Sequence, residues 1–259
     1  MRKIETIKKE KKIKGPKDVN RHGWLFSSPG IFFNFIFGWY PLVLGLIVAF
    51  QTFHLIKPPY FSGLNNFRNV FGDPLTLTVF RNTLYYTALS LALTFIIPIF
   101  IAILLMEMKK NTIRIMMILW FIPIAGMASL IIWKWFYNAD YGLFNGILVS
   151  LGLPTLRWLG DKRIAMLCLV LPGLIMYGPG LIYIASLQSI PDEFYEAAEL
   201  EGCGFWRKIW HITLPRLRPL ISMMLILAVI GNMQVFMQPF VMTGGGPGDA
   251  TRSVVMFYY

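Results

Sequence analysis

The stretch EAAELEGCGFWRKIWHITLP, residues 196–215, lies between two long apolar runs and differs from both of them. It is acidic at its start, contains two glycines in its middle and ends in a proline. A segment of this composition indicates a polar loop between two membrane-crossing helices, provided that the chain as a whole belongs in a membrane.

The composition of the whole chain supports that setting. Of its 259 residues, 56% are hydrophobic and only 14% are charged, whereas soluble domains carry about 25% charged residues. The net charge of +11 comes largely from Lys and Arg near the ends of apolar runs, where membrane topology places them. We therefore predict an integral membrane protein that contacts membrane lipid and no nucleic acid.

Five apolar runs are long enough to cross a bilayer: residues 31–53, 79–106, 113–136, 164–187 and 220–242. A turn-rich segment follows the fifth run, and residues 253–259 are apolar again. Seven helical residues cover about 10 Å, a third of the hydrocarbon core, so we expect the start of a sixth, truncated span. The predicted fold is an all-α polytopic helical bundle over residues 23–259, preceded by a Lys-rich tail over residues 1–22.

Lys and Arg are distributed unevenly between the loops. With the N-terminus in the cytoplasm, the inner segments hold sixteen of these residues and the outer segments hold eight. Such an excess marks the cytoplasmic side of a membrane protein. We predict a multi-pass protein of the inner (cytoplasmic) membrane of a prokaryote, with its N-terminus, its tail and the 189–215 loop in the cytoplasm.

We expect the 189–215 loop to contain a short amphipathic helix. Ser189 is placed to cap this helix, with Asp192 three residues later. Gly202 weakens a helix and so can mark a bend, while Pro215 and Pro219 are expected to close the loop and open the fifth span. One face of the helical wheel is apolar, with the acidic residues opposite: Phe194, Tyr195, Ala198, Gly202, Phe205 and Trp206.

Two roles are open for such a helix. A helix that lies flat on the membrane usually carries Lys and Arg on its polar face, whereas this polar face is acidic. Ala198 and Gly202 are four residues apart, so their small side chains would let another backbone approach one face closely. Docking into a groove of a partner protein therefore fits better than lipid contact, which remains the alternative.

The same stretch carries a recognisable signature. Glu196, Ala197 and Ala198, then Gly202 after three residues and ITLP after nine more, resemble the pattern EAA–x3–G–x9–I–x–L–P of permease subunits of binding-protein-dependent ABC importers. The resemblance implies the type I importer permease fold and implies that this loop is the coupling helix, which fits into a cleft of an ATPase subunit. The residues that would carry this coupling are Glu196, Ala197, Ala198, Gly202, Ile212, Leu214 and Pro215.

Other segments are similar to permeases that import sugars, of the maltose, multiple-sugar and glycerol-phosphate type: residues 138–142, 158–161, 184–202 and 241–248. The resemblance implies transport of a sugar or oligosaccharide together with two ABC ATPase subunits, a second permease that is a different chain, and an extracellular solute-binding protein. That binding protein would contact the outer loop at Gly244, Gly245, Gly246 and Pro247. The chain has no GxxxxGK[ST] phosphate loop, so we expect ATP and Mg to be used by the partner ATPase, and no catalytic, cofactor or metal site in this chain.

Polar side chains inside spans are candidates for a substrate pathway. Asn232, Gln234 and Gln238 lie in the fifth run, where Gln234 and Gln238 are four residues apart and are expected to share a face. Tyr177 and Trp133 are further candidates, because sugars bind aromatic surfaces. The alternatives are hydrogen bonding between helices for the amides and anchoring at the membrane interface for the aromatic residues.

Other functions fit the sequence less well. Glycerol phosphate or another small polar solute is an alternative cargo, but a phosphate site would need cations within the spans and only Lys134 comes near. An ion-coupled secondary transporter would need buried carboxylates, and a membrane-embedded enzyme would need convergent Asp, Glu, His or Ser groups. The apolar runs supply almost none of these groups.

Overall fold

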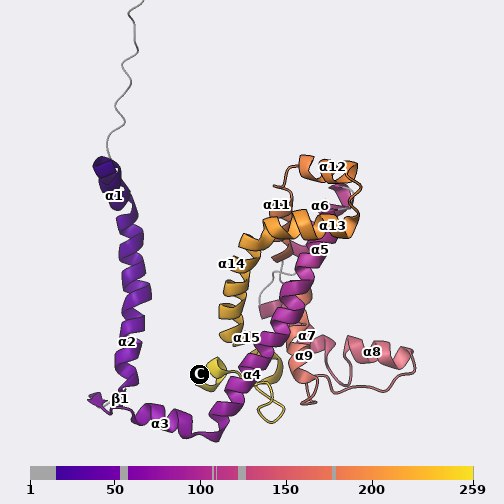
Figure 1. Cartoon of the computed structure of the whole chain (residues 1–259). Helices are drawn as coiled ribbons and strands as arrows, with labels where there is room; N and C mark the ends of the chain where they lie inside the picture. The colour runs from indigo at the N-terminus through magenta and orange to yellow at the C-terminus, as the bar shows by residue number, and fades with distance from the viewer. Residues whose placement is uncertain are drawn as a thin grey trace, which may run out of the picture. The chain divides into compact units, whose positions relative to one another are not determined.

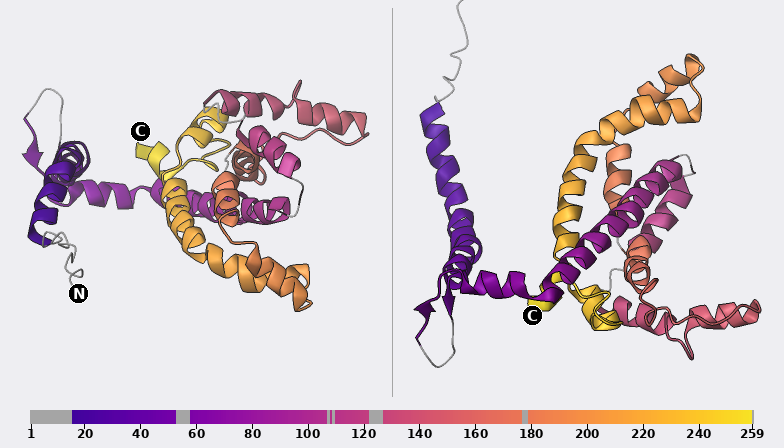
Figure 2. Two further views of the ribbon diagram at one scale, coloured as in Figure 1. Left: turned by 90° about the horizontal axis from the view of Figure 1, so that it is seen from above. Right: turned by 60° about the horizontal axis from the view of Figure 1, so that its bottom comes forward.

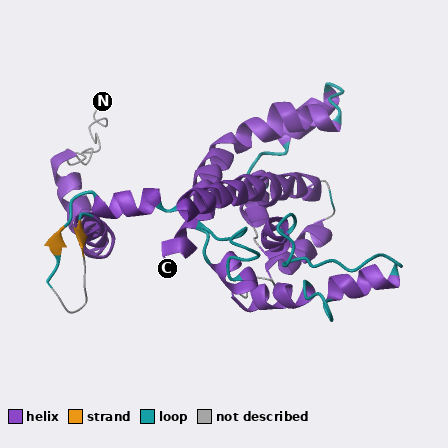
Figure 3. Cartoon of the chain, turned by 90° about the horizontal axis from the view of Figure 1, so that it is seen from below, coloured by secondary structure: helices purple, strands orange, loops and turns teal. Residues whose placement is uncertain are grey.

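The computed structural model describes residues 16–52, 58–106, 108, 110–121, 127–176 and 179–258. The chain divides into two compact units, Met1–Gly72 and Asp73–Tyr259, each of which is considered by itself. Among the described residues, helices make up most of both units, and the strands form one short pair (Figures 1 and 3). The predicted all-α fold is confirmed.

The first unit contains one long, nearly continuous helix, a small β-hairpin and a short helix. Its elements are α1 (Pro16–Asn34), the π turn η1 (Phe35–Trp39), α2 (Tyr40–Ala49), the antiparallel strands β1 (Gln51–Thr52) and β2 (Tyr60–Phe61), and α3 (Asn65–Gly72). The Asn66 side chain donates from Nδ2 to the carbonyls of Ala49 and Gln51, each at 2.9 Å, which attaches α3 to the end of α2.

The candidate membrane-spanning helix of this unit starts earlier in the chain than the first apolar run does. Residues Gly23–Ala49 are long and apolar enough to span a bilayer, whereas the sequence predicts a span over 31–53. The helix already begins at Pro16, within the predicted tail. Residues 1–15 of that tail lie outside the described residues.

The second unit begins with a single long helical rod. It consists of α4 (Pro74–Ser90), the π turn η2 (Leu91–Phe95) and α5 (Ile96–Met106), and it is the second candidate span. Asp73 caps its start, because Oδ1 accepts a hydrogen bond from the Leu75 N–H at 2.8 Å. The π turn lies just before Pro98, whose ring nitrogen has no proton to give to the carbonyl four residues earlier. The rod therefore starts five residues before the predicted span and passes its proline without a break.

The third and fourth apolar runs are divided into shorter helices: α6 (Lys110–Phe121), α7 (Met127–Phe136), α8 (Leu143–Ser150), α9 (Ala165–Val170), α10 (Pro172–Met176) and α11 (Pro179–Leu187). Residues 122–126 and 177–178, which lie within these runs, are outside the described residues. Three helices of the described part are long and apolar enough to cross a membrane. The total of five spans and the start of a sixth stays a prediction.

The last part of the chain corrects the predicted fifth span. Its elements are α12 (Glu193–Leu200), α13 (Phe205–Lys208), the π turn η3 (Ile209–Thr213), α14 (Leu214–Met233), α15 (Met237–Thr243) and α16 (Val254–Tyr258). The helix that contains the third candidate span runs from Phe205 to Met233 and stops there, instead of covering 220–242. Figures 1 and 2 show it turning from a segment that lies across the end of the bundle into α14.

Prolines lie at both places where the observed helix differs from the predicted fifth span, namely its earlier start and its end at Met233. Pro215 cannot donate to the carbonyl four residues earlier, and η3 lies at that position, with the Leu214 N–H bonded to the Ile209 carbonyl instead. Pro219 is accommodated inside α14. Pro239 lies in the first turn of α15, where an N–H would have no helical partner, so a new helix begins just before it.

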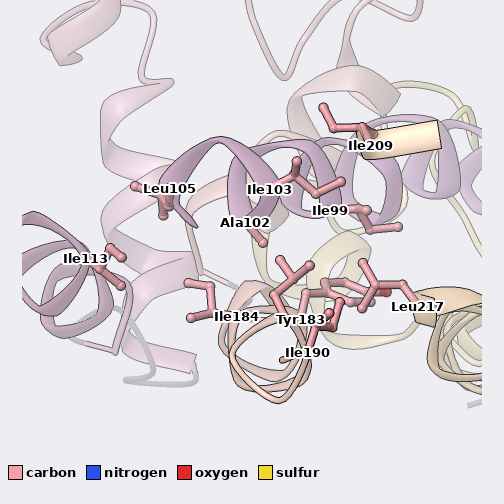
Figure 4. Close-up of a cluster of buried hydrophobic side chains, with 11 residues drawn as sticks. Ile99, Ala102, Ile103, Leu105, Ile113, Tyr183, Ile184, Ile190, Ile209 and Leu217 are labelled. Atoms are coloured by element: carbon pink, nitrogen blue, oxygen red, sulfur yellow. The ribbon is translucent and has the colours of Figure 1, made fainter. Parts of the chain in front are cut away.

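Two apolar clusters hold the second unit together. In the first cluster, shown in Figure 4, α5 packs against α11 through Ala102, Ile103, Tyr183 and Ile184, and Ile209 and Leu217 complete it from the α13–α14 segment. The second cluster joins α4, α7, α9 and α15. Tyr183 and Ala102 are fully buried, and a small alanine opposite a large tyrosine lets the two helices approach closely. The loop around α12 and the loop after α15 lie at opposite ends of this unit (Figure 1).

Candidate functional site

Helix α12 forms the outermost element at its end of the second unit, beyond α13 (Figure 1). It begins after Asp192, which occupies the N-cap position without a side-chain hydrogen bond to the helix. The prediction that Ser189 caps this helix is wrong, because its Oγ donates to the carbonyl of Ser186 at 2.6 Å. The acidic residues Glu193 and Glu196 lie in the first turn, where they interact favourably with the helix dipole.

Gly202 ends α12 in a left-handed turn. Its φ is +75°, its N–H bonds to the carbonyl of Glu199 at 2.9 Å, and the N–H of Cys203 bonds to the carbonyl of Ala198 at 2.9 Å. These two bonds form a Schellman cap, which needs a residue with positive φ and usually uses glycine. The spacing between Glu196 and Gly202 in the signature therefore corresponds to the length of this helix and its cap.

The cap also corrects the predicted helical wheel. The bend expected at Gly202 is confirmed, but the chain leaves the helix there, so Gly202, Phe205 and Trp206 do not continue the face of Ala198. Tyr195 and Ala198 are half-buried. The outward face of α12 contains Glu196, Ala197 and Leu200, and the Leu200 side chain is 91% exposed.

Leu200 is a residue that the sequence signature did not single out. A leucine almost fully exposed at the tip of a loop is unfavourable in water, and here it shares the outward face with Ala197 and Glu196. The signal that could have revealed it is its position three residues after Ala197, on the same side of a helix that ends at Gly202.

Three side-chain contacts attach α12 to the helix that follows. Glu199 Oε1 and Lys208 Nζ form an ion pair at 2.8 Å, and the hydroxyls of Tyr195 and Thr213 are 3.1 Å apart. The guanidinium carbon of Arg216 lies 3.7 Å from the centroid of the Phe194 ring, a cation–π contact. The three partners lie on α13, η3 and α14 in turn, so α12 is attached to successive parts of one continuous helix.

The closing ITLP of the signature forms the junction between η3 and α14. Thr213 is buried, Ile212, Leu214 and Pro215 are half-buried, and Leu214 packs against the first apolar cluster. Pro215 lies in the first turn of α14, next to the π turn η3. These residues therefore fix the base of the loop and do not belong to its exposed face.

A cavity of about 700 Å³ lies between part of α12 and the bundle, beside the place where Tyr195 packs against the first apolar cluster. Its walls combine apolar side chains of α5 and α6 with the polar side chains that hold α12, including Tyr195, Lys208 and Thr213. Helix α12 is thus held by its side-chain contacts to the following helix and by the packing of Tyr195, with the cavity beside these contacts.

The glycine-rich loop after α15, at the other end of the unit, is held by hydrogen bonds within the loop and from α4. The Thr251 hydroxyl is 2.6 Å from both the Thr243 hydroxyl and the Gly246 carbonyl, and Asn82 Nδ2 donates to the carbonyls of Asp249 and Arg252 at 2.7 and 3.1 Å. Of the predicted contact residues, Gly244 is exposed, Gly246 and Pro247 are half-buried and Gly245 is buried. Gly244 and Gly245 have positive φ, so the loop path depends on glycine.

Comparison with known proteins agrees with this arrangement. Residues 108–256, which include α12 with its cap and the glycine-rich loop, match the family model described as "Binding-protein-dependent transport system inner membrane component". The chain belongs to this family. Membership places it among membrane-embedded transport components and agrees with its long apolar helices.

Among the relatives of this family member are two named permeases. The trehalose/maltose transport system permease protein MalF of Thermococcus litoralis is 35% identical over 213 residues, which cover 80% of this chain and 71% of that protein. The sulfoquinovosyl glycerol transport system permease protein SmoG of Agrobacterium fabrum is 30% identical over 235 residues, which cover 84% of this chain and 76% of that one. A solved bacterial ABC transporter involved in the import of alginate has a chain with a TM-score of 0.77 at 24% identity, covering 93% of this chain and 84% of that chain, and this likeness supports the importer permease fold.

The candidate pathway residues of this binding-protein-dependent transport component are separated by the structure. Asn232 Oδ1 accepts a hydrogen bond from Ser90 Oγ at 2.9 Å, so it links α14 to α4. Gln234 follows the end of α14 and is exposed, while Gln238 lies in α15. The expectation that Gln234 and Gln238 share one helical face is wrong, because the helix is broken between Met233 and Met237.

The partner of Asn232 belongs to a row of hydroxyls that are not among the predicted pathway residues. Thr83, Thr87, Ser90 and Thr94 follow one another at helical spacing along α4 and η2, and the first three are buried. Thr87 and Thr94 each donate to the carbonyl four residues earlier, at 2.8 and 2.9 Å. A spacing of three to four residues in the sequence is the signal that could have revealed them, because it places polar atoms on one side of an apolar rod.

Trp133 lies within a cluster of aromatic rings. Its ring centroid is 5.8 Å from those of Phe136 and Tyr137 and 6.0 Å from that of Phe144, and Trp158 completes the cluster. Buried Asn145 fixes the adjoining loop by bonding to Ala139, Leu156 and Trp158. Tyr177, the other aromatic candidate, lies outside the described residues.

Within the described part of the chain, no group of three or more His, Cys, Asp and Glu residues is placed to hold a metal ion.

Proposed function

We propose that this chain is a membrane-spanning permease subunit of an ATP-driven ABC importer for a sugar or oligosaccharide. It resides in the inner membrane of a prokaryote with its N-terminus in the cytoplasm. The observation that carries this proposal is the protruding acidic helix α12, ended by the left-handed Gly202 and exposing Leu200. A helix of this kind suits a groove on a partner protein better than it suits lipid.

The partner at α12 is an ABC ATPase, of which two serve the importer. The ATPases bind ATP and Mg and perform the hydrolysis, while this chain binds no cofactor and catalyses no reaction. Glu196, Ala197 and Leu200 enter the ATPase, with the small Ala197 allowing close approach and Leu200 supplying the apolar contact. The ion pair, the hydroxyl contact and the cation–π contact of α12 pass its displacement to the α13–α14 helix.

The α13–α14 helix connects this movement to the interior of the bundle. It ends at Met233, directly after Asn232 and before Gln234, so its displacement changes the position of these amides relative to Ser90 on α4. A second permease, a different chain, completes the pathway. The outer loop at 244–247 contacts the solute-binding protein, and Asn82 holds the neighbouring part of that loop in place.

A neutral sugar suits the polar groups of the described spans. The buried polar side chains are hydroxyls and Asn amides, which can exchange hydrogen bonds with sugar hydroxyls. Lys134, a cation in the last turn of α7, donates from Nζ to the Val241 carbonyl at 3.0 Å. Several relatives are named for transport of carbohydrates, including trehalose/maltose, arabinooligosaccharides and lactose. These observations favour sugar over glycerol phosphate as the cargo.

Uptake into proteoliposomes tests the proposal. Vesicles that contain both permeases and the ATPases, supplied with the solute-binding protein, should accumulate a labelled sugar only when ATP is enclosed with the ATPases. Uptake that persists without the ATPases and follows a proton or sodium gradient would instead establish a secondary transporter. Competition by a panel of unlabelled sugars and glycerol phosphate identifies the cargo.

A further inference from the structure

The segment α13–η3 has a surface that differs in charge from α12. Figures 1 and 2 show this segment lying across the end of the bundle before the chain turns into α14. Its inner side, with Ile209 and Thr213, is buried. Its outer side carries Trp206, Arg207, Trp210 and His211, all of them exposed. We call these four residues, together with the exposed Arg218 near the start of α14, the elbow face.

The elbow face combines two tryptophans with basic groups. The Trp206 and Trp210 side chains are 62% and 64% exposed, and they lie one turn apart, as do Arg207 and His211. The His211 ring is oriented by a 3.0 Å hydrogen bond between Nδ1 and the Arg207 carbonyl. Among the described residues, neither Arg207 nor the following Arg218 forms an ion pair with a carboxylate.

The elbow face is continuous with the membrane-crossing part of the helix. Along α14 the exposed side chains include Met223, Ile226, Leu227 and Ile230, which recur at helical spacing and form an apolar stripe. From this stripe toward α13, the exposed side chains change to Arg218 and then to Trp210, Arg207 and Trp206. Basic and aromatic side chains that follow an apolar stripe are typical of the place where a helix passes from hydrocarbon to the headgroups. A short helix with Trp and Arg on its exposed face is typical of a segment that lies in the interface plane.

We propose that the elbow face binds anionic phospholipid headgroups of the cytoplasmic leaflet and so sets the level at which α12 meets the ATPase. The inference rests on the proposed function, because that function places the loop in the cytoplasm. Arg207, His211 and Arg218 face the phosphates, and Trp206 and Trp210 lie at the boundary with the hydrocarbon. The acidic outward face of α12 is repelled by the same lipid and projects away from it.

The test uses the complete importer in nanodiscs of phosphatidylcholine, with or without phosphatidylglycerol. The variant Arg207→Gln/Arg218→Gln removes two cations, and Arg68→Gln/Arg163→Gln is the control, since it removes two exposed cations elsewhere. Each cation near an anionic surface contributes about a fivefold change in binding. Native mass spectrometry measures the phosphatidylglycerol that the complex retains. The affinity of the elbow variant for this lipid should be roughly 25-fold lower, and the affinity of the control should be unchanged.

A second variant removes the aromatic part of the face. Trp206→Ser/Trp210→Ser should lower the amount of sugar imported per ATP hydrolysed in phosphatidylglycerol, while Trp135→Ser, at another exposed tryptophan, should not. The proposal is overturned if the elbow variants and the controls depend equally on phosphatidylglycerol. It is also overturned if Trp206 is protected from oxidative labelling by the ATPase in lipid-free detergent, which would make the occupant a protein. ATP-driven uptake that does not depend on the lipid would refute the elbow proposal but not the importer function. Absence of ATP-driven uptake in every lipid would refute the importer function itself.

Discussion

Replacing Gly202 by serine should weaken attachment of the ATPase without disturbing the rest of the chain. Gly202 has a φ of +75°, where an L-residue costs about 1–2 kcal/mol more than glycine. A Cβ added at this position meets no atom within 4 Å. The whole cost is therefore conformational, and no collision adds to it.

The size of the effect follows from this strain. If the docked loop needs the Schellman cap and the free loop can relax, a strain of about 1–2 kcal/mol lowers the affinity for the ATPase about 5- to 30-fold. Gly202→Asn should lower the affinity for the ATPase less than Gly202→Ser does, since asparagine tolerates the left-handed region better than serine. Titration of the detergent-solubilised permease pair with labelled ATPase measures this affinity.

Gly204→Ser is the matched control for this experiment. Gly204 has φ −70° and ψ 167° at the N-cap of α13, its Cβ position is also empty, and serine is favoured at N-caps. The control should bind the ATPase as well as the unaltered chain does. Equal affinities for Gly202→Ser and Gly204→Ser would refute the view that the left-handed cap is part of the docked structure.

Three other substitutions test contacts that hold the loops. Asn145→Ala should lower the thermal stability of the importer, at about 1–3 kcal/mol for each buried partner left without a hydrogen bond, and an unchanged melting temperature would show that these bonds do not stabilise the loop. Asn82→Ala should release the backbone of residues 244–252, so hydrogen exchange in this loop should accelerate, and stimulation of the ATPase by the binding protein should fall. Unchanged exchange would contradict the anchoring role of Asn82. Glu199→Gln should change stability by less than about 1 kcal/mol, because the carboxylate of its ion pair with Lys208 is 62% exposed, and a larger loss would indicate that the pair is better shielded than the structure suggests.

The position of the 189–215 loop could be predicted more accurately than its geometry. The signature located α12 and the bend at Gly202, because an acidic start and a glycine are local features of the chain. The helical wheel failed after Gly202, since a regular wheel cannot represent a residue with positive φ. Leu200 was missed because its exposure depends on where the helix ends.

Hydropathy located the apolar runs but not the ends of the helices. The fifth run is apolar through Met242, yet the helix stops at Met233, where Ser253 Oγ donates to the carbonyl of Val235 at 2.7 Å. This contact comes from a residue 18 positions away and could not be read from local sequence. The same limit applies to Asn82, whose role as an anchor depends on a loop 167 residues later in the chain.

The most direct test of the account is the accessibility of Leu200 in the assembled importer. In a chain whose free Cys168 and Cys203 are replaced by serine, Leu200→Cys should react with a membrane-impermeant maleimide in inside-out vesicles and become protected when the ATPase is added. Reaction from the outside of intact cells, or equal reaction with and without the ATPase, would contradict the docking of α12 into a cytoplasmic partner.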